Sequence, residues 1–347
     1  MQKQQPMYRT ICSADTIMLC CKEGTENRTR GRKAAESRCV MAKRILDSYA
    51  SDFKGFTKKD LLESVAKSEG RVLMCETIGT IRPMLGDVTN AEFVSAMGAD
   101  FLLLNMFDVK NPEIQGLPKE APYDTVRMVK RLTGRPVGIN LEPAEDDKME
   151  ETDALWRMSE GRRATLENAQ RACEMGVDLI LLTGNPGMGV SNEAIERTLR
   201  LYRENLGDKI ILAAGKMHAA GILEEAAEQI ITKEDVRRFR EAGADILLFP
   251  APGSVPGITV SYVKELVSYA HSLGALTITA IGTSQEGADT ATIRQMALMC
   301  KMTGTDIHHL GDAGYAGMAL PENIQAYSVA VRGIRHTYHR MAASILR

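Results

Sequence analysis

An α/β fold made of eight strand–helix units is predicted for this chain from three observations. First, a helical stretch ends in glycine and a short apolar run follows it, eight times between Gly70 and Gly304. Second, these junctions lie 28 to 42 residues apart, which is room for one strand, one helix and two loops. Third, the runs are almost continuous in Val, Ile, Leu and Phe, as expected for parallel strands buried on both faces. Eight such units favour a closed (β/α)8 barrel, the TIM barrel, over an open doubly wound sheet.

The chain before the first junction changes character near Met41. Residues 1–40 follow neither the period of a strand nor that of a helix, and are predicted to be a flexible extension outside the fold. Thr57 followed by Asp60 has the arrangement of a helix N-cap with an acidic third position. We therefore expect an extra helix that covers the bottom of the barrel or packs on its side, within a single barrel domain over residues 41–347.

Each strand is expected directly after a junction glycine, with a helix in each interval. Glycine suits a helix end because the residue that follows often adopts a left-handed conformation, which costs least without a Cβ atom. The junction glycines are Gly70, Gly98, Gly134, Gly176, Gly207, Gly243, Gly274 and Gly304. The helical patterns cover residues 90–97, 123–132, 162–175, 192–205, 232–242, 261–273, 291–303 and 321–344.

Composition and charge exclude several classes of function. A formal net charge of −2 without a basic patch argues against a nucleic-acid partner, and no basic amphipathic face indicates a membrane surface. The longest apolar runs have the length of a strand, and the run at residues 17–21 is too short for the core of a signal peptide. No dinucleotide-binding fingerprint indicates a nicotinamide cofactor, and nothing favours a flavin. We expect a cytoplasmic protein, and a homo-oligomer is left open.

Candidate catalytic residues follow from the predicted barrel, whose active sites form at the C-terminal ends of the strands. Glu76 and Glu142 end the first and third strands, and suit an acid/base pair or ligands of a divalent cation such as Mg²⁺, together with Asn105 or Asp108. Lys216 ends the fifth strand, where an amine suits a Schiff base, a proton acceptor or an anion contact, and His218 lies two residues on. The alternative is a plain salt bridge, of each glutamate with a nearby Lys or Arg, or of Lys216 with Glu142 or Glu76.

Candidate substrate-binding residues come from the same strand ends. The glycine-rich loops after strands seven and eight are predicted to hold phosphate through backbone N–H groups, although ordinary turns would also contain glycine. His308 and His309 are adjacent on the last strand, so at most one of them faces the site. The predicted binding residues are Asn105, Asp108, Asn140, Thr183, Asn185, Gly282, Thr283, Ser284, Gly311, Asp312 and Gly314.

Part of the chain resembles the BtpA-like barrel family. Residues 98–108 (GADFLLLNMFD) look like that family's second-strand motif, and residues 136–140 (PVGIN) are similar to its third-strand motif. Residues 216–218 (KMH) are similar to its Lys-His on strand five, with one residue inserted. The family's Asn-Asp after strand three is replaced here by Leu141 and Glu142. The resemblance covers about a third of the chain and implies a barrel.

From Met41 onward the chain also resembles bacterial barrels loosely labelled as phosphoenolpyruvate-mutase-like or dehalogenase-like. It lacks the metal-binding acidic motif of the mutases and the Asp-x-Asp motif of the dehalogenases, so those activities are not implied. The sequence thus predicts an enzyme acting on a phosphorylated sugar or acid, with the acid–base chemistry of a lyase, isomerase or hydrolase. The alternative is a non-catalytic sensor or assembly factor that binds a phosphorylated metabolite.

Overall fold

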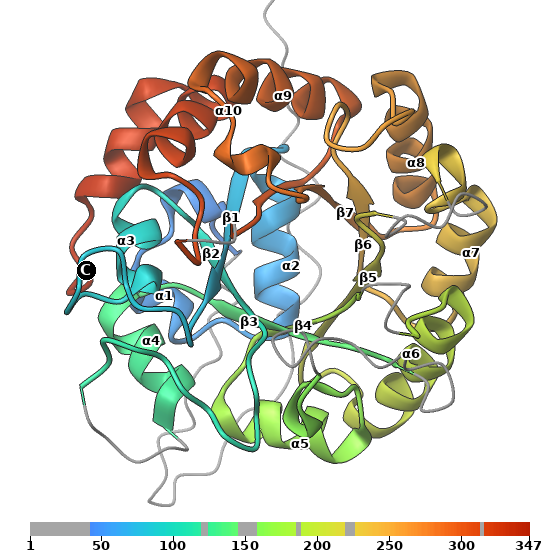
Figure 1. Cartoon of the computed structure of the whole chain (residues 1–347), viewed down its shortest axis with the longest axis horizontal. Helices are drawn as coiled ribbons and strands as arrows, with labels where there is room; N and C mark the ends of the chain where they lie inside the picture. Colours follow the sequence, from blue (N-terminus) through green and yellow to red (C-terminus); the bar gives the residue numbers. More distant parts are fainter. Residues whose placement is uncertain (1–41, 119–123, 145–157, 185–188, 219–225, 313–315) are drawn as a thin grey trace, which may run out of the picture. The chain divides into compact units, whose positions relative to one another are not determined.

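The computed structural model describes residues 42–118, 124–144, 158–184, 189–218, 226–312 and 316–347. Eight parallel strands form a closed barrel in sequence order, which confirms the predicted TIM barrel (Figure 1). The strands are β1 (Val72–Ile78), β2 (Phe101–Asn105), β3 (Val137–Leu141), β4 (Leu179–Leu182), β5 (Ile211–Gly215), β6 (Ile246–Pro250), β7 (Leu276–Ile281) and β8 (Ile307–Leu310). The extension predicted over residues 1–40 lies outside the described residues.

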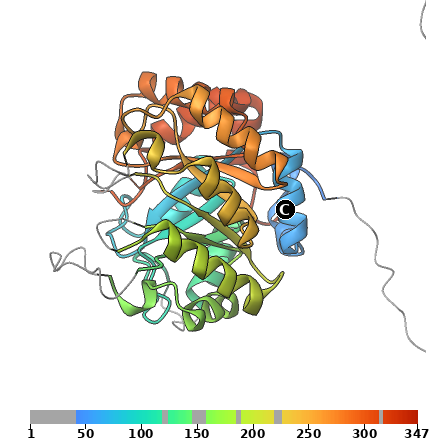
Figure 2. The same cartoon turned by 90° about the vertical axis from the view of Figure 1, so that its right-hand side faces the viewer.

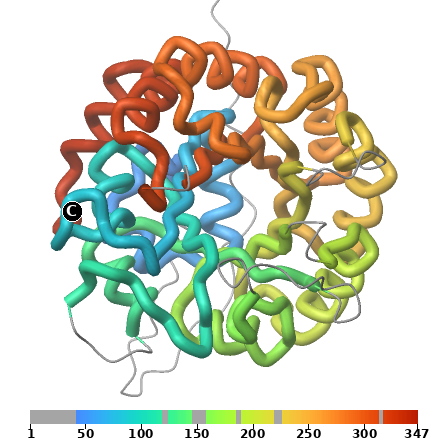
Figure 3. The backbone as a smooth tube through the Cα atoms, in the orientation of Figure 1, coloured from blue at the N-terminus to red at the C-terminus, as the bar shows by residue number. Residues whose placement is uncertain are grey.

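Helices α3 to α10 surround the barrel, as the cartoon and the backbone tube both show (Figures 1 and 3). They are α3 (Asn90–Ala96), α4 (Thr125–Thr133), α5 (Leu166–Met175), α6 (Asn192–Leu206), α7 (Lys233–Glu241), α8 (Val260–Ser272), α9 (Thr290–Thr303) and α10 (Pro321–Ala342). All eight expected helices are present. Among the described helices, none combines the length and the apolar character that crossing a membrane requires.

The barrel is closed at one end by the segment that precedes β1. This segment contains η1 (Ile45–Asp47), α1 (Ala50–Phe53) and α2 (Lys58–Lys67), and Figure 2 shows the blue α2 at one end of the barrel. Ile45, Leu61 and Val65 pack with the inward-facing side chains of the strands. The Thr57 hydroxyl and the Asp60 carboxylate form the predicted capping box, which fixes the start of α2. The extra helix therefore covers the bottom of the barrel.

Four aspartates fasten the strands at this same end, and each stands at a Gly-x-Asp sequence just before an even-numbered strand. Each carboxylate accepts a hydrogen bond from a backbone N–H at the start of the preceding strand, at 2.8 to 2.9 Å. The pairs are Asp100 with Leu73, Asp178 with Val137, Asp245 with Leu212, and Asp306 with Thr277. The motif thus joins the barrel strands two by two.

Each of these aspartates also contacts a basic side chain. Asp178 pairs with Lys130 at 2.8 Å, Asp245 with Lys58 at 2.7 Å, and Asp306 with His271 at 2.8 Å. These partners lie on helices that pack beside the corresponding strands or below the barrel. Asp100 instead contacts two arginines of α10, as described next.

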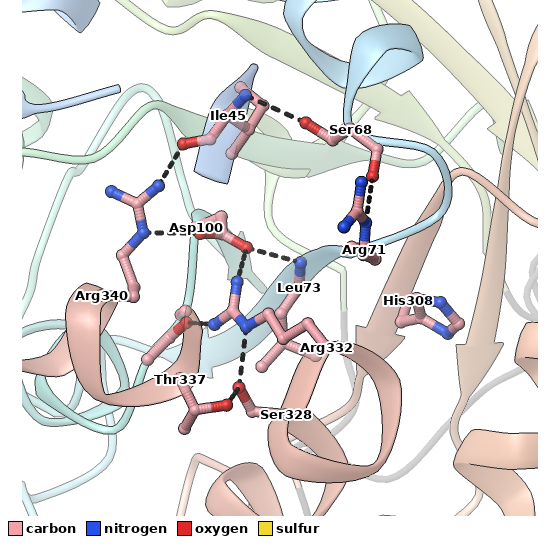
Figure 4. A network of polar contacts seen from close by, with 12 residues as sticks. Ile45, Ser68, Arg71, Leu73, Asp100, His308, Ser328, Arg332, Thr337 and Arg340 are labelled. Carbon is pink, nitrogen blue, oxygen red and sulfur yellow. Dashed lines mark hydrogen bonds and ion pairs between the residues drawn. The ribbon is translucent and has the colours of Figure 1, made fainter. Parts of the chain in front are cut away.

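Asp100 is the most enclosed of the four and lies between Arg332 and Arg340 (Figure 4). Burial opposes ionisation, but the two guanidinium groups outweigh it and hold the pKa of Asp100 below its ordinary value. Arg340 also donates to the carbonyl oxygens of Ile45 and Ser48. Helix α10 is thereby fastened both to the start of β2 and to the segment that closes the barrel.

Replacing Asp100 with Asn should destabilise the protein by about 3–5 kcal/mol, because it leaves buried guanidinium groups without their counter-charge. Urea unfolding of the full chain would measure the loss. Asp178→Asn is the matched control, since its partner Lys130 is one third exposed and its charge is better solvated. Equal losses in the two variants would contradict the special role given to Asp100.

The contact between His271 and Asp306 predicts a pH-dependent part of the stability. The hydrogen bond that His271 donates to Asp306 raises the pKa of His271 above its ordinary value. This contribution is therefore complete below about pH 6.5 and is lost as the pH rises through the raised pKa. His271→Asn should flatten the dependence of the melting temperature on pH between about 6 and 8. A variant that keeps the wild-type slope would assign that slope to other groups.

Candidate functional site

A polar layer lies across the opposite end of the barrel, at the C-terminal ends of the strands. Met74, Leu103 and Ile307 belong to the apolar interior. Side chains two residues further along a strand share its face, so Glu76, Asn105 and His309 continue the inward-facing series. The apolar interior therefore ends in a layer of ionisable and amide groups.

A chain of hydrogen bonds joins this layer. Asn140 Nδ2 donates to Glu76 Oε1 at 2.8 Å and to Asn105 Oδ1 at 3.0 Å. Asn105 Nδ2 donates to Asp312 Oδ2 at 2.8 Å. The chain connects residues of β1, β2 and β3 with the loop after β8. All four residues were predicted site residues, and the structure brings them into direct contact.

Glu76 is the central acid of this layer, and only 4 % of its surface is exposed to solvent. Burial raises its pKa well above the ordinary value, and the nearby charges of Asp312 and Glu286 add to the rise. The hydrogen bond from Asn140 acts in the opposite direction and does not outweigh them. Glu76 therefore holds its proton at pH values where an ordinary glutamate is ionised.

His309 faces the barrel interior beside Glu76, with its Nε2 atom 3.7 Å from Glu76 Oε2. Burial lowers its pKa to about 4, so the ring is neutral at neutral pH. Neither ring nitrogen has a hydrogen-bond partner among the described residues. His308 faces outward, where its ring nitrogens lie 3.0 Å from the Tyr327 hydroxyl and from the Gly70 carbonyl oxygen. Only one of the two histidines faces the site, as predicted.

Glu142 lies just beyond β3 and is engaged by an arginine. Arg162 Nε donates to its Oε1 at 3.1 Å, and Arg162 Nη2 contacts the same oxygen. Burial raises the pKa of Glu142 although this guanidinium works against the rise. The ion pair is the plain salt bridge that the sequence left open, and a catalytic role for Glu142 stays a prediction.

Lys216 directly follows β5 and is 3 % exposed. Ala213 belongs to the interior of the barrel and Ala214 to the layer between strands and helices. Lys216 continues the series of Ala214, so the alternation of the strand alone does not direct it into the mouth. His218 is half-buried, and burial lowers its pKa. The proposed roles of both residues stay predictions.

The remaining predicted binding residues lie in different settings. Thr183 is buried after β4. The Asp108 carboxylate accepts hydrogen bonds from the backbone N–H groups of Lys110 at 2.7 Å and Asn111 at 2.9 Å. It therefore stabilises the turn that follows it. Burial opposes its ionisation, but hydrogen bonds hold the pKa of Asp108 below its ordinary value. Asn185 and Gly314 lie outside the described residues.

The loop after β7 contains two consecutive non-glycine residues with left-handed backbone conformations. Thr283 has φ 58° and Ser284 has φ 71°, which costs of order 1–3 kcal/mol for each residue. Asn323, near the start of α10, donates to the carbonyl oxygens of Glu286 and Ala288 and so holds the far side of this loop. Such strain is typical of segments that are shaped for binding.

The loops after β7 and β8 approach each other closely. A Cβ atom on Gly311 would lie 2.9 Å from the Ile281 carbonyl oxygen and 3.2 Å from the Glu286 carboxyl group, so glycine is required there. Gly282 has more room. Glu286 is 2 % exposed, whereas Thr283 and Ser284 are exposed. The loop therefore presents two hydroxyl-bearing residues to solvent and keeps a carboxyl group buried.

Two members of this layer were missed at the sequence level. His309 was not separated from His308, although the inward position of Ile307 fixes which one faces the mouth. Glu286 lies within the glycine-rich loop, where only the glycines and hydroxyl groups were selected. Within the described ranges, no three His, Cys, Asp or Glu side chains are arranged to hold a metal ion. A divalent cation stays an expectation.

Fold and polar layer together define a TIM-barrel protein with a candidate site at the usual end of the barrel. The chain belongs to the family described as "Domain of unknown function (DUF7916)", whose model matches residues 46–347. No curated protein matches the chain. The family match neither supports nor overturns the resemblance to BtpA-like barrels, which stays a prediction.

Solved structures with a similar fold share little sequence with this chain. An archaeal fructose 1,6-bisphosphate aldolase is 13 % identical, with a TM-score of 0.49, over 77 % of this chain and 95 % of that one. The thiamine phosphate pyrophosphorylase from Pyrococcus furiosus is 14 % identical, with a TM-score of 0.43, over 76 % and 96 %. The deoxyribose phosphate aldolase from Aeropyrum pernix is 15 % identical, with a TM-score of 0.44, over 78 % and 97 %. These likenesses concern the fold alone.

The raised pKa of Glu76 predicts that this carboxyl group costs stability once it is ionised. Stability should be complete below the unfolded pKa of about 4.3 and should fall as the pH rises toward the raised folded value. Glu76→Gln keeps the acceptor for Asn140 and removes the titration. Its melting temperature should match the wild type near pH 5 and exceed it near pH 8. A variant less stable than the wild type at pH 8 would show that the ionised carboxylate is stabilising.

Proposed function

We propose that this protein is an enzyme that acts on a phosphorylated small molecule by proton transfer at the mouth of the barrel. The observation that carries the proposal is Glu76, a buried carboxyl group with a raised pKa at the end of an inward-facing strand series. General acids and bases require a pKa close to the working pH. Because its pKa is raised well above the ordinary value, Glu76 is shifted in the direction that this requirement demands.

The surrounding groups support this role by fixing the carboxyl group in one orientation. Asn140 binds Glu76 Oε1, and Asn140 is itself held by Asn105, which is held by Asp312. A proton donor or acceptor is efficient only when its geometry is set before the reaction. Glu76 Oε2, which faces His309, is the oxygen left for proton exchange with a substrate. The proposed chemistry is that of a lyase, isomerase or hydrolase.

The phosphate group is proposed to bind at the loops after β7 and β8. Support comes from the strained backbone at Thr283 and Ser284, the exposed hydroxyl groups of these residues, and the absence of room for a side chain at Gly311. In many TIM barrels these two loops hold phosphate. The phosphate would be bound by the exposed Thr283 and Ser284 hydroxyl groups and the backbone N–H groups of these loops.

The test is a set of phosphorylated metabolites, each paired with its dephosphorylated form. We expect the phosphorylated member of a pair to raise the melting temperature of the full chain and to be converted to product. Glu76→Gln should lower kcat by about 10²–10⁴-fold while the stabilisation by substrate persists. Glu234→Gln, an exposed change on α7, is the matched control and should keep full activity.

Three outcomes would count against parts of this proposal. Equal stabilisation by both members of every pair would remove the phosphate assignment. Full activity of Glu76→Gln would remove Glu76 from the chemistry. Stabilisation by phosphorylated ligands without any product would identify a non-catalytic metabolite sensor instead of an enzyme.

A further inference from the structure

We propose that the barrel mouth binds a primary ammonium group of its ligand beside Glu76 and Asn140, so that the substrate is an amino-bearing phosphorylated metabolite. The inference rests on the proposed function, because it names the chemical class of substrate for the same site. Two observations support it: a buried acceptor without a donor at Asn140, and the negative charges that surround Glu76.

Asn140 has an acceptor that no donor reaches among the described residues. An amide nitrogen carries two hydrogen atoms, and both are used here, one on Glu76 Oε1 and one on Asn105 Oδ1. The Oδ1 atom of Asn140 is buried and has no hydrogen-bond partner among the described residues. A buried acceptor without a donor costs about 1–3 kcal/mol. The group that completes this part of the site is therefore a hydrogen-bond donor.

The charges around Glu76 point to the same kind of group. The charges of Asp312 and Glu286 both act on Glu76 as repulsive neighbours. His309 is neutral and contributes no positive charge at neutral pH. A positive charge placed against Glu76 would favour its carboxylate form, the form that can accept a proton from the substrate.

An ammonium group meets both requirements, since it carries three donors and one positive charge. A hydroxyl group supplies one donor but no charge. A phosphate or carboxylate at this position would face an acceptor and negative charges. When the ligand binds as an ammonium, Glu76 releases its proton to solvent. No bond to carbon forms or breaks in this step.

The test uses two small probes that differ only in this group. Phosphoethanolamine and 2-hydroxyethyl phosphate share the phosphate and the chain length, and carry an ammonium and a hydroxyl group respectively. Isothermal titration calorimetry of the full chain at pH 7, in two buffers with different ionisation enthalpies, gives both affinity and proton release. We expect at least about tenfold tighter binding of phosphoethanolamine, with proton release that 2-hydroxyethyl phosphate does not cause.

Variants separate this inference from a general preference for cations. In Glu76→Gln the preference for phosphoethanolamine should fall toward equality and the proton release should vanish. Glu234→Gln should keep both. Should the Gln variant not fold, the comparison of the two probes on the wild-type chain still decides the question. Equal affinity of the probes, no binding of either probe, or binding without proton release would overturn the inference.

The outcomes also separate this inference from the proposed function. Turnover of a phosphorylated metabolite that is lost in Glu76→Gln, with equal affinity for the two probes, would reject the ammonium site and keep the enzyme. A preference for phosphoethanolamine without turnover of any metabolite would reject the enzyme and keep the ammonium site. Proton release caused by MgCl₂ alone, without discrimination between the probes, would assign the site to a metal ion and overturn the inference.

Discussion

The architecture depends on one buried carboxylate. Asp100 accepts a backbone hydrogen bond from the start of β1 and ion-pairs with two arginines of α10. Through Arg340 the same cluster reaches the segment that closes the barrel. The pairing of β1 with β8 closes the barrel, and Asp100 adds a side-chain connection between the first units and the last helix. The other three Gly-x-Asp sequences repeat the arrangement with one basic side chain each, and their carboxylates are less buried than that of Asp100.

The two ends of the barrel use buried charge in opposite ways. At the bottom, Asp100 has guanidinium groups within ion-pair distance, and its ionised form is favoured. At the mouth, Glu76 has carboxylates and amides as neighbours, and its neutral form is favoured. Burial disfavours the charged form in both places, so the sign of the neighbouring charge decides the outcome. The charged form is therefore favoured at one end of the barrel and the neutral form at the other.

Much of the fold could be predicted because its signals are local. Junction glycines, apolar runs and the Thr57 cap each require only a few consecutive residues, and every expected strand and helix is present. The Gly-x-Asp sequences were visible as well, but their meaning depends on partners far away in the chain. Arg332 lies 232 residues from Asp100, and no periodicity connects the two.

Site residues could be predicted where they lie within a strand, because side chains there alternate between the inside and the outside of the barrel. Glu76, Asn105 and Asn140 lie within their strands, so position along the strand places them at the mouth. Glu142 and Lys216 lie one residue past a strand end, where alternation no longer determines the direction of a side chain. Sequence position alone could not foresee the ion pair between Glu142 and Arg162, which depends on how the following segment returns to the barrel.

The separation between Asp100 and Arg332 also has a consequence for synthesis of the chain. At about 5–20 residues per second, the ribosome needs roughly 10–50 s to go from the aspartate to its first arginine partner. During that interval the carboxylate has no α10 guanidinium to contact, so burying it would be costly. Full burial of Asp100 is therefore expected only after α10 has emerged from the ribosome.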